Sequence, residues 1–194
     1  MESGFFAMLF RMKYINRWGL MRNTRTESLS EHSLDTAVIA HALGILRNKR
    51  FGGSVDAGRL AALAMYHDAG EIITGDLPTP VKYHDEQIRR AYKQVEAEAS
   101  WRLLSLLPQD LREEYQAVLL PQSGDEELWR LIKAADKLSA LIKCIEEERA
   151  GNQEFTQAKL AQIKALDEMR LPEADAFRAE FLGAFYKTLD EQEA

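Results

Sequence analysis

The chain has 194 residues, and its 25 lysines and arginines against 31 aspartates and glutamates give a formal net charge of −6. This acidic balance argues against a general duplex-binding protein, because a negative surface repels phosphate backbones. The 46% hydrophobic content argues against disorder, and the short, charge-interrupted apolar runs argue against a membrane span.

The first 25 residues differ in charge from the rest of the chain. Five basic residues stand against one acidic residue there, a local charge of +4, which leaves −10 for the remainder. They are Arg11, Lys13, Arg17, Arg22 and Arg25. Such a segment suits one small anion better than a polymer, although a solvated helix face is the alternative.

Two further features of the sequence bear on its location. The basic residues at the N-terminus follow an apolar patch, the reverse of a signal peptide, so we expect this segment to belong to the mature fold. The single cysteine, Cys144, has no partner for an internal disulfide, which suits a reducing compartment. We therefore expect a cytoplasmic protein.

Apolar residues recur at helical spacing, and no stretch shows sustained strand alternation, so the sequence predicts one all-α domain over residues 1–194. Ser28 and Glu31 form a capping-box pattern, Asp56 can cap the following helix, and Pro108 and Gly151 end helices. In chain order, the predicted helices cover about residues 5–10, 28–48, 56–71, 85–107, 110–121, 125–149, 154–166 and 173–189. Residues 15–27 are expected to be a loop with a broken helix, and residues 74–83 a loop because of their two prolines.

The third predicted helix carries ionisable groups on its apolar face. At about 100° per residue, one stripe contains Leu60, Leu63, Ala64, His67 and Glu71. Asp68 lies at the edge of this stripe. Buried carboxylates need a compensating partner, either a metal ion or a basic residue from elsewhere.

The helix that begins at Ser28 carries a second histidine of this kind. His32 heads an apolar stripe made by Thr36, Ile39, Leu43 and Leu46. His41 lies about 180° from His32 on the same helix, so we interpret it as a packing or surface residue.

Asp136 completes a pattern of two imidazoles and two carboxylates on three different helices, His32, His67-Asp68 and Asp136. Mixed nitrogen and oxygen ligands suit Mn, Fe, Co, Ni or Zn more than Ca or Mg. Because Lys133 and Lys137 flank Asp136, a surface ion pair is the alternative. A second pair, His84-Asp85, lacks a preceding apolar stripe, and we do not expect it to bind metal.

The order H, HD, D on successive helices resembles the HD-domain metal-dependent phosphohydrolases. The segments INRWGLMRNTRTESLSEHS, LAMYHDAGEIITGDLPTPVKY and IKAADKLSALIKC resemble, more closely, the bacterial HD-type 5′-deoxynucleotidases. The resemblance covers about Phe5 to Phe155. It implies an all-α HD helical bundle with the metal site between helices, a homodimer, and hydrolysis of 2′-deoxyribonucleoside 5′-monophosphates to a deoxynucleoside and phosphate.

The resemblance also implies roles for individual residues. One divalent transition metal, such as Co or Mn, would be held by His32, His67, Asp68 and Asp136. Arg17 would contact the phosphate and take part in catalysis, Trp18 would contact the sugar, and Glu71 would transfer the proton. The nucleotide pocket would be lined by Asp76, Leu77, Pro78 and Thr79, together with His32 and Asp68.

Alternatives remain for several of these residues and for the function. Glu71 can be a capping or ion-pair carboxylate, Trp18 can be core packing, and Asp76 can stabilise a turn. The enzyme can instead act on a triphosphate, cyclic or stringent-response nucleotide, or the chain can be a non-catalytic nucleotide-binding regulatory module. The stripe of the last helix favours core packing over an interface and contains Phe177, Phe181, Leu182, Phe185 and Leu189.

Overall fold

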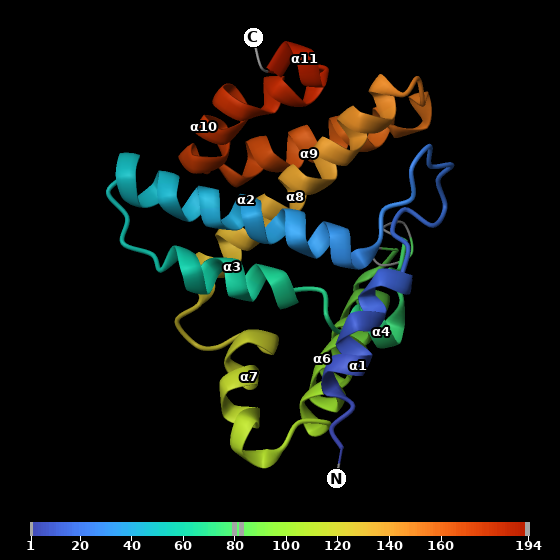
Figure 1. Ribbon diagram of the computed structural model, residues 1–194, viewed down its shortest axis with the longest axis vertical. Helices are drawn as coiled ribbons and strands as arrows, with labels where there is room; N and C mark the ends of the chain where they lie inside the picture. The colour runs from blue at the N-terminus through green and yellow to red at the C-terminus, as the bar shows by residue number, and fades with distance from the viewer. Residues whose placement is uncertain (1, 79–80, 82–83, 193–194) are drawn as a thin grey trace.

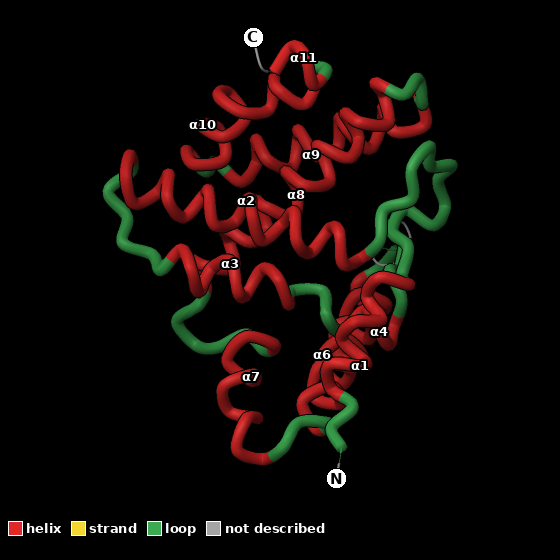
Figure 2. Tube along the Cα trace, viewed as in Figure 1, coloured by secondary structure: helices red, strands yellow, loops and turns green. Residues whose placement is uncertain are grey.

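The computed structural model describes residues 2–78, 81 and 84–192, so the predicted pocket residue Thr79 lies outside the described residues. Within these ranges the chain is helical, and the sole strand-like feature is an isolated antiparallel bridge between Asn16 and Ser28 (Figure 2). This confirms the predicted all-α class. No described helix is both long enough and apolar enough to cross a bilayer.

The α-helices run in chain order as α1 (Phe5–Leu9), α2 (Leu29–Arg50), α3 (Ala57–Tyr66), α4 (Glu71–Thr74), α6 (Glu86–Ser105), α7 (Arg112–Leu119), α8 (Glu126–Arg149), α9 (Thr156–Met169), α10 (Pro172–Phe181) and α11 (Leu189–Gln192). Short 3-10 turns cover Phe10–Tyr14, Gln109–Leu111, Gln153–Phe155 and Leu182–Tyr186. In Figure 1, α2 and α3 cross the front of the molecule with α8 behind α2, and the two termini lie at opposite ends.

Side-chain caps set the predicted helix starts. Ser28 and Glu31 form both hydrogen bonds of the capping box that opens α2. Asp56 accepts from the backbone N–H of Arg59 at 2.9 Å and opens α3. Asp85 caps α6 in the same way, so the second His-Asp pair has a structural role for its aspartate.

Three predicted elements are wrong in detail. The helix predicted to carry Glu71 on its apolar stripe ends at Tyr66, and a turn over residues 67–70 separates it from α4, so Glu71 does not share the α3 face. A Cβ atom on Gly70 would lie 3.1 Å from the carbonyl oxygen of Glu96, which shows how closely α6 packs against this turn.

The other two corrections lie outside the turn over residues 67–70. Residues 15–27 contain no helical segment. The predicted terminal helix ends at Phe181 and is followed by a 3-10 turn and α11; Phe177 is buried, whereas Phe181 and Leu189 are exposed.

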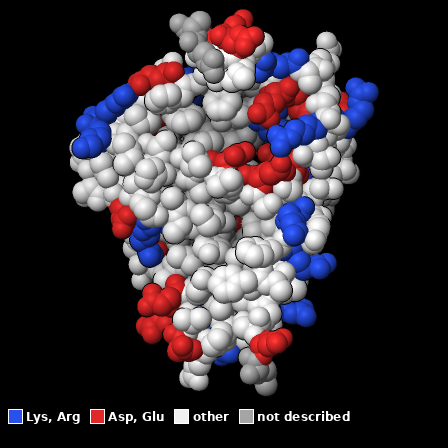
Figure 3. Space-filling model, in the orientation of Figure 1, with Lys and Arg blue, Asp and Glu red and all other residues white. Residues whose placement is uncertain are grey.

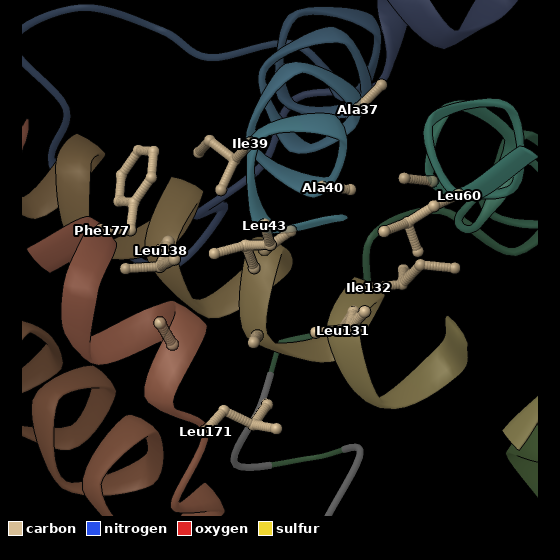
Figure 4. Close-up of a cluster of buried hydrophobic side chains, with 14 of the residues drawn as sticks. Ala37, Ile39, Ala40, Leu43, Leu60, Leu131, Ile132, Leu138, Leu171 and Phe177 are labelled. Atoms are coloured by element: carbon tan, nitrogen blue, oxygen red, sulfur yellow. The ribbon is translucent and has the colours of Figure 1, made fainter. Parts of the chain in front are cut away.

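Two clusters of buried apolar side chains hold the helices together. The larger one joins α2, α3, α8 and α10, and Figure 4 shows Leu43, Leu60, Ile132 and Phe177 converging within it. The smaller one joins α1, α4, α6 and α7 around Phe5 and Leu103. The turn between α3 and α4 connects them, because Ala64 belongs to the larger cluster and Ala69 to the smaller.

Candidate metal centre and substrate site

The four predicted metal ligands come together where α2, α8 and the turn after α3 meet. The Nε2 atom of His32 lies 3.3 Å from Asp136 Oδ1 and 3.7 Å from Asp68 Oδ2. Asp68 Oδ2 in turn lies 3.1 Å from Nε2 of His67. Ligand atoms of His32, His67 and Asp68 all lie within 4.8 Å of one another. The geometry therefore joins three separate elements at one point.

Hydrogen bonds on the far side of each ring orient the two imidazoles. Nδ1 of His67 lies 2.7 Å from the carbonyl oxygen of Ala64, and because a carbonyl only accepts, this nitrogen carries the proton. Nδ1 of His32 lies 3.1 Å from the hydroxyl of Ser139, which leaves Nε2 facing the two aspartates. A hydrogen bond that orients the imidazole from its outer side is typical of metal-binding histidines.

The two carboxylates of the cluster favour the binding of positive charge at this site. Burial, together with the nearby Arg17, lowers the pKa of His32 to about 4. Burial also disfavours a charged His67, but Asp68 and Asp136 outweigh it and raise its pKa to about 9. Two partly buried carboxylates thus favour a proton on the neighbouring imidazole, and a divalent cation at this position would supply the same positive charge.

Both carboxylates are held ionised despite their surroundings. Burial on its own would raise the pKa of Asp68, yet His67 holds it well below its usual range. For Asp136 the same burial is outweighed by His32 and Lys137. Asp136 uses Oδ1 toward His32 and Oδ2 toward the Lys137 amine at 3.0 Å, so the ion pair considered from the sequence coexists with the cluster.

The donor set fits a divalent transition metal. Two imidazole nitrogens and two carboxylate oxygens are the ligands such ions take, and four protein ligands leave open positions on an octahedral ion. Nε2 of His67 lies 3.1 Å from Asp68 Oδ2 without the geometry of a regular hydrogen bond, and it has no other partner among the described residues. A buried nitrogen without a hydrogen bond is costly in an apolar protein interior and natural beside a cation.

Arg17 and Trp18 lie on the loop that leads into α2. The side chain of Arg17 is 13% exposed, and its Nη1 atom has no hydrogen-bond partner in the part of the chain that the structure describes. Trp18 has a φ of +59°, which is rare for a bulky side chain. Its backbone N–H donates to Asp76 Oδ2 at 3.2 Å, so the structure joins this loop to the loop after α4.

The remaining predicted residues surround this junction. Glu71 is buried at the first position of α4, and its N–H donates to the carbonyl of Asp68 at 2.9 Å. Leu77 and Pro78 are half-buried in the loop that follows Gly75. His41 is exposed, as expected from its position opposite His32.

Two residues that contact the site were missed by sequence reasoning. Ser139, which orients His32, lies three residues after Asp136, and the shared helical face was the available signal. Glu27 is 8% exposed and bonded to Trp18, but in the sequence it stands in a polar stretch beside a helix cap. No periodic pattern marks such a loop carboxylate as buried.

Comparisons with known proteins agree with this geometry. A family model described as 5′-deoxynucleotidase YfbR-like matches residues 4–185. The 5′-deoxynucleotidases of Yersinia pestis (strain Pestoides F) and Yersinia pseudotuberculosis serotype O:3 (strain YPIII) are each 51% identical over 189 residues, covering 97% of this chain and 96% of theirs.

Solved structures show the same fold. An HD-domain phosphohydrolase from Listeria innocua aligns with a TM-score of 0.81 at 23% identity, over 98% of this chain and 92% of that one. A cyanophage S-2L HD phosphohydrolase, bound to dA and one catalytic Zn2+ ion, aligns with a TM-score of 0.64 at 18% identity, over 94% and 96% of the two chains. The chain therefore belongs to the YfbR-like 5′-deoxynucleotidase family and is a hydrolase with the HD-domain fold.

Proposed function

We propose that the enzyme hydrolyses 2′-deoxyribonucleoside 5′-monophosphates at a single divalent transition metal, such as Co or Mn, bound by His32, His67, Asp68 and Asp136. The observation that carries the proposal is the cluster of two imidazoles and two partly buried carboxylates with Arg17 beside it. The relatives named 5′-deoxynucleotidases support the substrate class.

Arg17 would bind the phosphate. Its guanidinium is close enough to His32 to lower the pKa of that imidazole, and its Nη1 atom is buried without a hydrogen-bond partner among the described residues. A guanidinium offers two parallel N–H donors to a phosphate, and burial strengthens the pairing. One such cation suits a monophosphate better than a triphosphate.

Trp18 and Asp76 would form the sugar site. The Trp18 ring lies 5.2 Å from the ring of Phe155, and its backbone is bonded to the Asp76 carboxylate. A ribose 2′-hydroxyl placed against an indole finds no partner, which disfavours the ribonucleotide. The carboxylate of Asp76 would accept from the 3′-hydroxyl, while Leu77, Pro78 and Thr79 would line the pocket.

Glu71 would move the proton during hydrolysis. Its carboxylate is buried at the start of α4, three residues from Asp68, where it would take a proton from the attacking water or give one to the leaving 5′-oxygen. A divalent ion bound at the cluster would supply Lewis acidity, activating water and polarising a phosphoryl oxygen. His32 and Asp68 would also contact the bound nucleotide.

The test is phosphate release across nucleotides with added Mn or Co. The wild-type protein is expected to hydrolyse deoxyribonucleoside monophosphates much faster than their ribose counterparts, and Asp68→Ala is expected to lose both metal binding and turnover. Glu71→Ala should still bind metal and substrate but turn over roughly 10²–10⁴-fold more slowly. Turnover by Asp68→Ala would contradict the metal site, and release from triphosphates alone would favour another nucleotide.

We further propose a homodimer, a single HD-type domain over residues 1–194, and a cytoplasmic location. The packing of α9 on α8 and of α10 on α2 supports the single domain. Light scattering after gel filtration measures the oligomeric state, and a monomeric mass would contradict the dimer. Proteolysis that releases a stable fragment would contradict the single domain.

A further inference from the structure

Glu27 contacts both residues to which substrate recognition is assigned. Its Oε2 atom accepts a hydrogen bond from the indole Nε1–H of Trp18 at 2.9 Å, and the same oxygen lies 3.6 Å from Nε of Arg17. Its backbone carbonyl accepts from the N–H of Arg17 at 2.9 Å. One buried carboxylate thus touches the phosphate-binding and sugar-binding candidates together.

The position of Glu27 is itself fixed by the backbone. Asn16 and Ser28 form an antiparallel bridge, and the N–H of Leu29 donates to the carbonyl of Ile15 at 2.8 Å. This short pairing places Glu27 opposite Arg17, directly before the capping box of α2. His32 lies in the first turns of α2. Glu27 therefore connects the loop over residues 15–27 to the helix that carries a metal-ligand candidate.

Trp18 needs such support because its backbone is in an unfavourable conformation. A left-handed φ of +59° on a bulky residue is strained, and strain of this kind persists where surrounding bonds enforce it. Asp76 accepts from its N–H, and the Asn23 amide donates to its carbonyl at 3.3 Å. The ring then depends on Phe155 for packing and on Glu27 for a hydrogen bond.

We propose that Glu27 is a positioning residue that sets the selectivity of the enzyme for deoxyribose. It fixes the plane of the Trp18 indole through Nε1 and attracts the Arg17 guanidinium through an ionic contact of 3.6 Å at Nε. Neither Nε nor Nη1 of Arg17 has a hydrogen-bond partner among the described residues, so both remain available to the phosphate. The proposal rests on the function proposed above for Trp18 and Arg17. In this proposal Glu27 acts through these two residues.

Three substitutions separate the contributions of Glu27. Glu27→Met keeps the volume in a buried position but removes the acceptor and the charge. Glu27→Gln keeps an acceptor oxygen for the indole and removes the charge alone. Trp18→Phe keeps an aromatic ring and removes the same hydrogen bond from the other side.

The measured quantity is the ratio of kcat/KM for a deoxyribonucleoside monophosphate to that for its ribose counterpart. Glu27→Met is expected to lower the ratio roughly tenfold, the effect of losing a hydrogen bond to a charged group. Glu27→Gln is expected to keep the ratio within about twofold of wild type, because the amide oxygen still accepts from the indole. In a Trp18→Phe background, Glu27→Met should cause no further fall, because the two changes remove one interaction.

Glu154→Ala is the matched control. Glu154 accepts from the backbone N–H of Arg22 at 2.9 Å, so it holds the same loop without touching Arg17 or Trp18. This variant should keep the wild-type ratio. If Glu27→Met does not fold by circular dichroism, Glu27→Asp takes its place. This variant keeps the charge but draws the carboxylate away from the indole, so its ratio should fall, and an unchanged ratio overturns the proposal.

The outcomes distinguish this inference from the proposed function. A wild-type ratio in folded Glu27→Met, or an equal fall with and without the Trp18→Phe change, overturns the role of Glu27 and leaves the deoxynucleotidase assignment standing. A wild-type enzyme that hydrolyses both sugars equally contradicts the function proposed for Trp18 itself.

Discussion

Replacing Glu147 by glutamine is expected to destabilise the protein by loosening the loop that carries Arg17 and Trp18. Glu147 is 1% exposed on α8 and accepts from the backbone N–H and the hydroxyl of Thr24, at 2.9 and 2.7 Å. It also accepts from the Asn152 amide at 2.8 Å and pairs with the buried Lys143. The change would leave the Lys143 ammonium buried without its counter-charge.

The pKa of Glu147 gives the magnitude and the pH range. Burial alone would raise this pKa, but the bonds from Lys143, Asn152 and Thr24 lower it from 4.5 to about 2. A difference of that size corresponds to at most about 3 kcal/mol of unfolding free energy. Because the folded pKa is depressed, this contribution is complete above pH 4.5 and is lost as the pH falls toward 2.

Denaturant unfolding of wild type and Glu147→Gln over a pH series measures this contribution. The difference in unfolding free energy should be constant from neutral pH down to about pH 5.5 and shrink below pH 4.5. Glu146→Gln, at the exposed neighbouring position, is the control and should stay within about 0.5 kcal/mol of wild type. A difference that is negligible at pH 7, or that does not change between pH 7 and pH 3, would refute the reasoning.

Three further predictions concern the metal centre and the turn beside it. Ser139→Ala, which removes the hydrogen bond to Nδ1 of His32, is expected to lower metal affinity about tenfold in calorimetric titrations while leaving the fold intact. Gly70→Ala is expected to lower the unfolding free energy by about 1–2 kcal/mol, because the new Cβ would lie too close to the carbonyl of Glu96. An unchanged midpoint of chemical denaturation would argue against that contact. Saturating Mn or Co should stabilise the wild type by about 2.7 kcal/mol at a hundred times the dissociation constant and leave Asp68→Ala unaffected in a thermal melt; equal shifts in both proteins would place the ion elsewhere.

The helical class and most helix boundaries followed from periodicity and caps, because the signals for them are local. The start of α2 is an example, where Ser28 and Glu31 form the predicted capping box. The histidines were recognisable because an imidazole heading an apolar stripe is unusual. These features depend on neighbours three or four residues away, which a sequence displays directly.

The features that the sequence did not reveal depend on contacts between distant segments. At the break between α3 and α4, α6 packs closely against Gly70, and nothing near Gly70 in the sequence indicates a contact with Glu96. Glu27 is buried because its loop folds back onto Arg17 and Trp18, a pairing set by tertiary structure. Charge composition counts Glu27 among the acidic residues but does not distinguish a buried carboxylate from an exposed one.

The turn between α3 and α4 joins the two apolar clusters, and two of the four metal-ligand candidates lie on it. Figure 3 shows a broad uncharged area on the face where α2 and α3 lie, with acidic side chains gathered near the middle of the face and basic ones mostly toward its edges. An ion bound at this turn would hold together two parts of the protein that each have their own interior. If ion binding stabilises the contact between the two clusters, then a substitution that destabilises either cluster lowers the affinity for the ion. Side chains far from the reaction therefore contribute to metal affinity.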